Sequence, residues 1–190
     1  MTNNATTDIS LPKFEWTRLL GSSNFDSGSA LTTGSDGSIY IAGQTKGDLD
    51  SQINSGGFYD AFISKFNPDG TKDWTRLLGT SDIEFAHALT TGADGSIYIA
   101  GNTGGNLDGQ TNNRINDYNN AFISKFNPDG TKDWTRLFGS VSESAKALTT
   151  GADGSLYIAG QTSNGGVIGA YISKFNPDGT KDWTRLFGSV

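Results

Sequence analysis

The chain has 190 residues, a net charge of −6 and no cysteine. This negative charge repels phosphate backbones and argues against a nucleic-acid partner, while the missing thiols exclude disulfides, zinc–thiolate sites and a cysteine nucleophile. Aromatic residues make up 11% of the sequence, more than a disordered chain would carry. Length and composition together predict one folded domain over residues 14–190, preceded by a tail over residues 1–13.

The first thirteen residues contain neither a basic cluster nor an apolar run. They therefore do not resemble a cleavable signal peptide, and no later segment is long and apolar enough to span a membrane. On these features alone we expect a cytoplasmic protein.

The chain is organised around a repeated stretch of eleven residues. This stretch, 67–77, returns unchanged as 127–137 and 176–186, and the second half of a weaker copy occurs at 14–19. Its Asn-Pro-Asp-Gly start is typical of a tight turn, and the flanking segments are rich in β-forming residues. A β-hairpin is therefore predicted at each copy.

The repeat has a period near fifty residues. Tryptophans stand at 16, 74, 134 and 183, so the spacings are 58, 60 and 49 (74−16, 134−74, 183−134). Each period holds four short β segments, and both faces of the second one are apolar, as expected for a sheet packed between two others. The pattern predicts an all-β protein, a β-propeller of four-stranded antiparallel blades. The predicted elements are an extra strand at 14–21 and blades at about 30–79, 88–139 and 147–188.

The repeats resemble bacterial SBBP-type β-propeller repeats. The matching motifs are Trp-x-x-x-x-Gly at 74–79, the stretch from Ala-Leu-Thr-Thr-Gly to Ile-Ala-Gly at 88–101, and Ala-Phe-Ile-Ser-Lys-Phe-Asn-Pro-Asp-Gly-Thr at 121–131. The resemblance covers about residues 14–190. It implies a propeller scaffold without a fixed activity, often found in bacterial surface or extracellular proteins, so an extracellular location stands beside the cytoplasmic one.

Three blades cannot close a ring, since propellers usually have four to eight. Each end blade would expose an apolar face that needs a partner. We therefore expect the chain to associate with itself, most simply as a homodimer with six blades. How the extra strand at 14–21 pairs in such an assembly stays open.

Two loops place oxygen-bearing side chains at alternate positions, a pattern suited to a hard cation such as Ca²⁺. The predicted calcium ligands are Asp48, Asp50, Gln52, Asn54, Asp60, Asp108 and Asn112. The alternative is that these segments are polar surface loops rich in Asx turns. In the same loops, Phe58, Tyr59 and Tyr118 stand beside amides, and Tyr59 and Tyr118 are predicted to bind a sugar or a peptide.

The sequence offers no recognisable catalytic set. Its one histidine, His87, corresponds to Ser29 and Lys146 in the other repeats, so the fold does not require it. We expect a protein that is not an enzyme but a scaffold or interaction module, which binds a protein through its loops. The alternatives are a glycan-binding, lectin-like propeller and a calcium-stabilised surface protein.

Overall fold

The computed structural model describes residues 15–112, 119–139, 141–164 and 166–188, and its regular structure is all β. Blade 1 consists of β1 (Asp26–Thr33), β2 (Ile39–Thr45), β3 (Asp60–Phe66) and β4 (Lys72–Leu78). Blade 2 consists of β5 (Glu84–Thr91), β6 (Ile97–Thr103), β7 (Asn120–Phe126) and β8 (Lys132–Phe138). Blade 3 consists of β9 (Ser142–Thr150), β10 (Leu156–Asn164), β11 (Val167–Phe175) and β12 (Lys181–Phe187).

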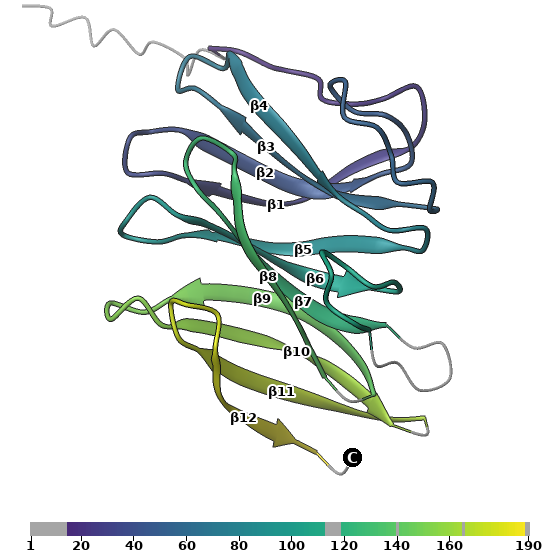
Figure 1. The fold of residues 1–190 in the computed structure, drawn as a ribbon. Coiled ribbons are helices and arrows are strands. Elements are labelled where there is room, and N and C mark those ends of the chain that lie inside the picture. The colour runs from purple at the N-terminus through teal and green to yellow at the C-terminus, as the bar shows by residue number, and fades with distance from the viewer. Residues whose placement is uncertain (1–14, 113–118, 140, 165, 189–190) are drawn as a thin grey trace, which may run out of the picture.

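Each blade is a four-stranded antiparallel meander, with its strands in sequence order across the sheet. Figure 1 shows the three blades stacked side by side, and the first strands β1, β5 and β9 contact one another in turn. These strands are therefore the inner strands, and β4, β8 and β12 are the outer ones. The predicted all-β propeller architecture of three four-stranded blades is confirmed.

The inner strands begin four or five residues earlier than predicted. A β-bulge shifts the register of β1 between Gly28 and Ala30, and β5 has the same shift between Ala86 and Ala88. The bulge interrupts the alternation of apolar and polar residues, so the polar start of each inner strand does not look like a strand in the sequence.

Two apolar cores lie between the blades rather than within one of them. The first joins Ile63 and Leu78 of blade 1 to Ile97 and Phe122 of blade 2. The second joins Ile123 and Phe138 of blade 2 to Leu156, Ile158 and Phe175 of blade 3. Blade 2 therefore buries both of its faces, as the sequence predicts.

The repeated turn has the geometry that its residues favour. In blade 2, Gly130 N donates to the carbonyl O of Asn127 at 2.9 Å, and Gly130 has a φ of +80°. Proline at the second position fixes φ, and glycine accepts the positive φ at the fourth. Asp129 Oδ1 then accepts from the amide and the hydroxyl of Thr131, at 2.9 and 2.7 Å.

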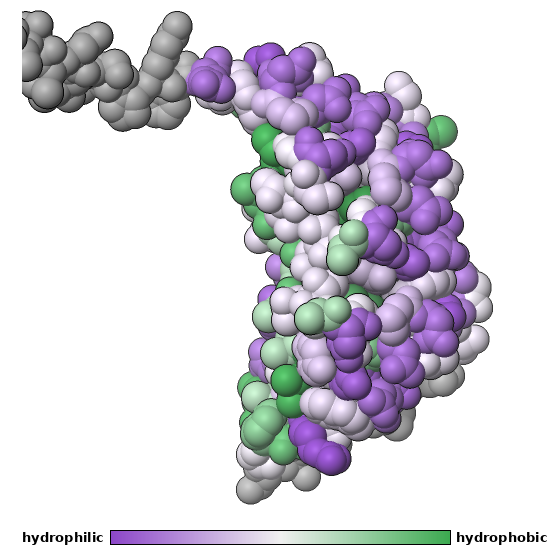
Figure 2. Space-filling model, turned by 90° about the vertical axis from the view of Figure 1, so that its left-hand side faces the viewer, coloured by the Kyte–Doolittle hydropathy of each residue, from purple (hydrophilic) through white to green (hydrophobic). Residues whose placement is uncertain are grey.

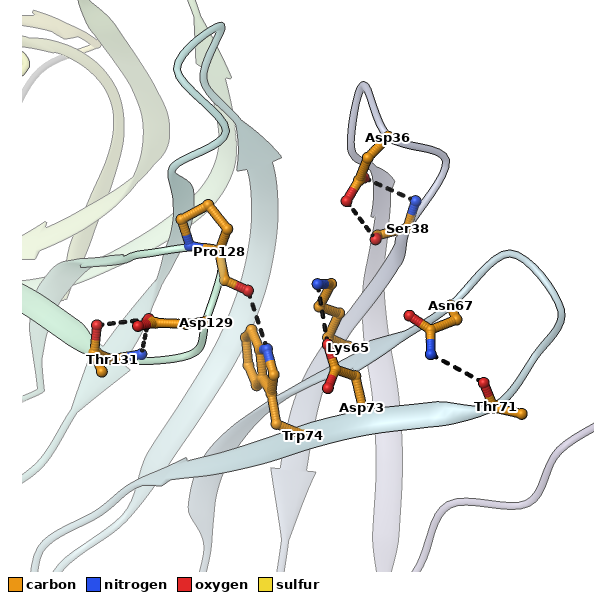
Figure 3. A network of polar contacts seen from close by, with 10 residues as sticks. All are labelled: Asp36, Ser38, Lys65, Asn67, Thr71, Asp73, Trp74, Pro128, Asp129 and Thr131. Atoms are coloured by element: carbon orange, nitrogen blue, oxygen red, sulfur yellow. Dashed lines mark hydrogen bonds and ion pairs between the residues drawn. The ribbon is translucent and has the colours of Figure 1, made fainter.

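The tryptophan of an outer strand packs on the turn of the next blade, and Figure 3 shows this for Trp74. Its Nε1 donates to the carbonyl O of Pro128 at 3.2 Å. Arg76 Nε donates to the carbonyl O of Gly130 at 2.8 Å. The Arg76 guanidinium also lies 5.5 Å from the centroid of the Trp74 ring. This arrangement, termed the Trp–Arg contact below, explains why both residues recur in the repeat.

The N-terminal segment makes the same contact without forming a strand. Arg18 Nε donates to the carbonyl O of Gly70 at 3.0 Å, and a Cβ added at Gly70 would meet the Trp16 ring at 2.5 Å. Residues 15–21 contain no strand, in contrast to the extra strand predicted at 14–21. The reason is that β4, β8 and β12 each pair with the third strand of their own blade, and this segment has no such neighbour.

The two ends of the stack leave apolar side chains exposed. Leu31 of blade 1 is 67% exposed, whereas its counterpart Leu89 in blade 2 is 8% exposed. Phe187 of blade 3 is 58% exposed, whereas its counterpart Leu78 is 2% exposed. In Figure 2, hydrophobic residues gather along one edge of the stack and toward the blade 3 end, opposite a hydrophilic edge. Over the described residues, the structure has no helix that could cross a membrane.

Candidate functional site

The loop between β2 and β3 turns back onto its own blade. Leu49 and Gln52 exchange backbone hydrogen bonds of 3.0 and 2.9 Å, across a turn whose two central residues both have positive φ. This turn points the Asp50 carboxylate at the Lys72 ammonium and the Thr75 hydroxyl of β4. Burial raises the pKa of Asp50, but the bonds from Lys72 and Thr75 outweigh it and hold that pKa below its usual value.

The loop between β6 and β7 repeats this arrangement. Asp108 has a φ of 52°, and its carboxylate contacts Lys132 and accepts a bond of 2.5 Å from the Thr135 hydroxyl. Leu107, the residue before it, is 1% exposed and lies in the core between blades 1 and 2. Both loops therefore fix a buried leucine and a paired aspartate on their own blade.

The predicted calcium ligands are only partly brought together. Asn54 N donates to Asp48 Oδ1 at 2.9 Å, and Asn112 N donates to Asn106 Oδ1 at 2.8 Å. Asp50 and Asp108 instead face the lysines of their outer strands. Within the described ranges, no group of three or more acidic, histidine or cysteine side chains could hold a metal ion. Calcium binding by these loops stays a prediction.

Asp60 is a buried carboxylate at the junction of blades 1 and 2. It is fully buried, its Oδ2 accepts from Ser55 N at 2.8 Å, and its Oδ1 has no hydrogen-bond partner. Burial raises its pKa. Burial also raises the pKa of nearby Glu84, whose carboxylate accepts from Thr80 N at 2.7 Å. In blade 2 the counterpart of Asp60 is the uncharged Asn120.

We expect Asp60→Asn to raise the free energy of unfolding at pH 7 by about 1 kcal/mol or more, because burying an unpaired charge costs more than burying a neutral amide. The pKa of Asp60 is higher in the folded than in the unfolded state, so ionisation destabilises the fold. The penalty is absent below the unfolded pKa of about 4 and complete above the folded pKa. The gain should therefore shrink as the pH falls toward about 4, as denaturant melts across pH would measure.

Asp48→Asn, an exposed aspartate in the same loop, serves as the control. Loss of stability in Asp60→Asn at pH 7 would contradict this prediction and point to a cation on the carboxylate. Repeating the melts in EDTA and in millimolar calcium tests the predicted calcium site directly. A rise of the midpoint with calcium that disappears in Asp60→Asn would assign the ion to Asp60.

An aromatic row crosses the junction of blades 1 and 2, next to Asp60. It consists of Phe25 before β1, Tyr59 before β3, and Phe85 and His87 on β5. The ring centroids of Phe25 and Tyr59 lie 5.9 Å apart, those of Tyr59 and Phe85 5.4 Å, and those of Phe85 and His87 6.2 Å. Glu84 N donates to the carbonyl O of Tyr59 at 2.8 Å, which fixes Tyr59 against the start of β5.

The aromatic row is built from positions at which the repeats differ. The strand registers identify which residues of blade 3 occupy the equivalent positions. Serine stands at the positions equivalent to Phe25 and Phe85, isoleucine at that of Tyr59, and lysine at that of His87. Apart from the loops between the second and third strands, most of the other strand positions carry the same or a similar residue in the three repeats. Since the fold forms without these rings in blade 3, the row is a feature of this junction and not a requirement of the repeat.

Phe58, the residue before Tyr59 in the first loop, adds an aromatic ring at the surface. Phe58 is 67% exposed and Phe25 is 55% exposed, and the Lys46 ammonium lies 5.3 Å from the centroid of the Phe58 ring. Tyr59 is half-buried within the row. Of the predicted ligand-binding residues, Tyr59 therefore lies in an aromatic cluster, and Tyr118 lies outside the described residues.

The inner end of the row meets polar side chains of blades 2 and 3. His87 Nε2 lies 2.8 Å from Asn102 Oδ1 and 3.1 Å from Lys146 Nζ, and the Ser144 hydroxyl donates to Asn102 Oδ1 at 3.1 Å. Burial lowers the pKa of His87, so its imidazole is neutral at neutral pH. The aromatic row therefore has an exposed, apolar end at Phe25 and a polar, uncharged end at the His87 imidazole.

The sequence motifs do not indicate that Phe25 and Phe85 belong to the candidate site. Neither belongs to a motif, and both precede or begin inner strands whose start the bulge conceals. The signal that could have found them is a position-by-position comparison of the repeats, in which aromatic rings replace serine or isoleucine at neighbouring places.

Two protein families match parts of the chain. A family described as a β-propeller domain of unknown function, DUF5122, matches residues 34–75 and 151–184. The family described as the SBBP β-propeller repeat matches residues 15–50. Both support the repeat architecture seen in the structure.

Two curated proteins are similar to the chain. The regulatory protein FlaEY of Caulobacter vibrioides is 28% identical over 175 residues, which cover 83% of this chain and 18% of FlaEY. An uncharacterized WD repeat-containing protein, L264, of Acanthamoeba polyphaga mimivirus is 33% identical over 89 residues, which cover 43% of this chain and 6% of L264. The chain therefore spans less than a fifth of the length of either relative.

Proposed function

Because the chain carries SBBP-type β-propeller repeats, we propose that it is a non-enzymatic interaction module that binds a protein partner through the aromatic row. The observation that carries this proposal is the gathering of rings at positions where the repeats differ. A scaffold alone needs only the repeated residues, whereas a binding site needs residues that distinguish one place on the stack from the others.

The chemistry of the row suits a protein segment. Phe25 and Phe58 are exposed, and Ile53 in the same loop is 80% exposed, so this end offers apolar area to a partner. Aromatic anchors carry much of the binding energy of protein interfaces. The similarity to FlaEY, which is named a regulatory protein, supports an interaction role.

Phe58→Ala tests the site against a matched control. The counterpart of Phe58 in blade 3 is Val167, which is 48% exposed at the start of β11. We expect peptides selected from a displayed library on the full chain to bind Phe58→Ala about tenfold more weakly or worse, the loss typical of an interface anchor. Val167→Ala should bind them as tightly as the unchanged protein, as fluorescence anisotropy would measure.

A glycan array probed with the same three proteins distinguishes the lectin-like alternative. Retention of a glycan by the unchanged protein and by Val167→Ala, but not by Phe58→Ala, would assign the aromatic row to a sugar. A selection that yields only ligands that bind Phe58→Ala and the unchanged protein equally would contradict the proposed site.

We also propose that the chain forms a homodimer of six blades. The exposed face of blade 3, with Phe187, carries the residues that blades 1 and 2 bury against the next blade. Light scattering should give a mass near 40 kDa, twice the 20.1 kDa of one chain. A monodisperse species near 20 kDa that melts cooperatively would contradict this prediction.

A further inference from the structure

A pocket of about 450 Å³ opens between blades 2 and 3, away from the aromatic row. Its apolar walls are Phe138 of β8, Tyr171 of β11 and Leu186 of β12. Its polar wall is formed by Lys181 and Thr184 of β12. Most of the pocket is formed by blade 3, whose strands are arranged as in blades 1 and 2. These two blades therefore show what occupies the equivalent position.

In blade 2 the corresponding place is filled by the loop between β6 and β7. The counterparts of the pocket residues are Leu78, Phe122, Leu137, Lys132 and Thr135, in the register of the repeat. Leu107 packs in the core with the first three of these residues. Asp108, the next residue, contacts Lys132 and Thr135 through its carboxylate.

Blade 1 uses the same two residue types. Leu49 is 1% exposed, and Asp50 contacts Lys72 and Thr75. In blade 3, β10 and β11 (Figure 1) instead form a tight hairpin. Asn164 and Val167 are paired at its end. The third loop is therefore too short to supply a leucine and an aspartate.

The pocket walls of blade 3 keep the residues that contact the leucine and the aspartate in the other blades. Leu186 is 59% exposed, and Lys181 and Thr184 are exposed, whereas Thr75 and Thr135 are each 4% exposed beneath their own loops. The Ser173 and Thr184 hydroxyls lie 2.7 Å apart, as do their counterparts in the other blades at 2.8 Å.

Two further residues of the pocket bear on its ligand. The Tyr171 hydroxyl is buried and has no hydrogen-bond partner among the described residues, and it replaces the phenylalanine of blades 1 and 2. Glu143 also lines the pocket. Its counterpart Glu84 accepts a hydrogen bond from the Thr103 hydroxyl, which also donates to the carbonyl O of Gly105 in the second loop. A glutamate at this position is therefore compatible with Asp108 in the same loop.

We propose that this pocket binds a segment of a partner protein in which an aliphatic residue is followed by an aspartate in a tight turn. The aliphatic side chain fills the space between Phe138, Tyr171 and Leu186, as Leu107 does in blade 2. The aspartate carboxylate accepts from the Lys181 ammonium and the Thr184 hydroxyl, as Asp108 does from Lys132 and Thr135. The site is distinct from the aromatic row and recognises a different chemistry.

A cyclic peptide that carries residues 106–112 with the Leu-Asp turn preformed is the probe. Ring closure reduces the ordering cost of so small a ligand. We expect it to bind the full chain, with shifts in the NMR signals of β11 and β12. Changing its aspartate to asparagine should weaken binding about tenfold, because a charge-assisted bond is lost.

Lys181→Ala and Lys132→Ala are the matched protein variants. The first removes the ammonium of the pocket, and the second removes its counterpart in blade 2, which is already engaged by Asp108. We expect Lys181→Ala to bind the cyclic peptide about tenfold more weakly and Lys132→Ala to bind it as the unchanged protein does. No binding at millimolar peptide, or binding that is indifferent to Lys181 and to the peptide aspartate, would overturn the proposal.

Discussion

We expect Trp74→Ala to lower the free energy of unfolding by about 3–5 kcal/mol, the cost of removing a large aromatic side chain from a core. Trp74 is 8% exposed, and its ring centroid lies 6.1 Å from that of Tyr40. The substitution also removes the bond to Pro128 O and the ring beneath Arg76. A typical domain is stable by about 5–15 kcal/mol, so denaturant melts would show a large shift of the midpoint.

Trp16→Ala is the control for Trp74→Ala. Trp16 makes the same Trp–Arg contact with the turn at Gly70, but from a segment that pairs with no strand and that leaves this ring half-buried. Its loss should therefore cost clearly less than the loss of Trp74. Equal losses in the two variants would contradict this expectation, because the N-terminal segment would then contribute as much as an integrated outer strand.

The second large effect is expected for Gly130→Ala. The positive φ of Gly130 costs an alanine about 1–2 kcal/mol. The added Cβ would also lie 2.7 Å from the Trp74 ring, and overpacking of this kind typically costs about 1–3 kcal/mol more. The two terms together predict a loss of about 2–5 kcal/mol in the free energy of unfolding.

Gly109→Ala separates the backbone cost of positive φ from the cost of overpacking against Trp74. Gly109 has a similar φ of +74°, but a Cβ there would meet no atom within 4 Å. It should therefore lose only the backbone part, about 1–2 kcal/mol. Equal melting midpoints for the two variants would show that the Trp74 ring does not pack against the turn of blade 2.

The repeated parts of the fold could be predicted from the sequence because their causes are local. The Asn-Pro-Asp-Gly turn at 127–130 fixes its own geometry, and alternation sets the faces of the neighbouring strands. The segment at 14–21 resembles an outer strand equally well. It forms none within 15–21 because pairing depends on a neighbouring third strand, which a local pattern does not reveal.

The candidate site was harder to predict because its residues meet only when blades pack. Tyr59 could be named from its loop, but Phe25, just before β1, and Phe85, on β5, join it from different blades. The alternating oxygens of the first loop suggested ligands around one ion. Positive φ at Asp50 and at the next residue reverses the chain, and the Asp50 carboxylate pairs with Lys72 instead.

We propose that the chain binds its partner at positions where the repeats differ. Chemical-shift mapping of the isotopically labelled full chain, titrated with the tightest peptide selected from the library, distinguishes these positions from the repeated ones. We predict shifts concentrated at Phe25, Phe58, Tyr59 and Phe85, with the corresponding positions of blade 3 unchanged. Shifts centred on the repeated turns, or spread equally over the three blades, would contradict this location of the binding site.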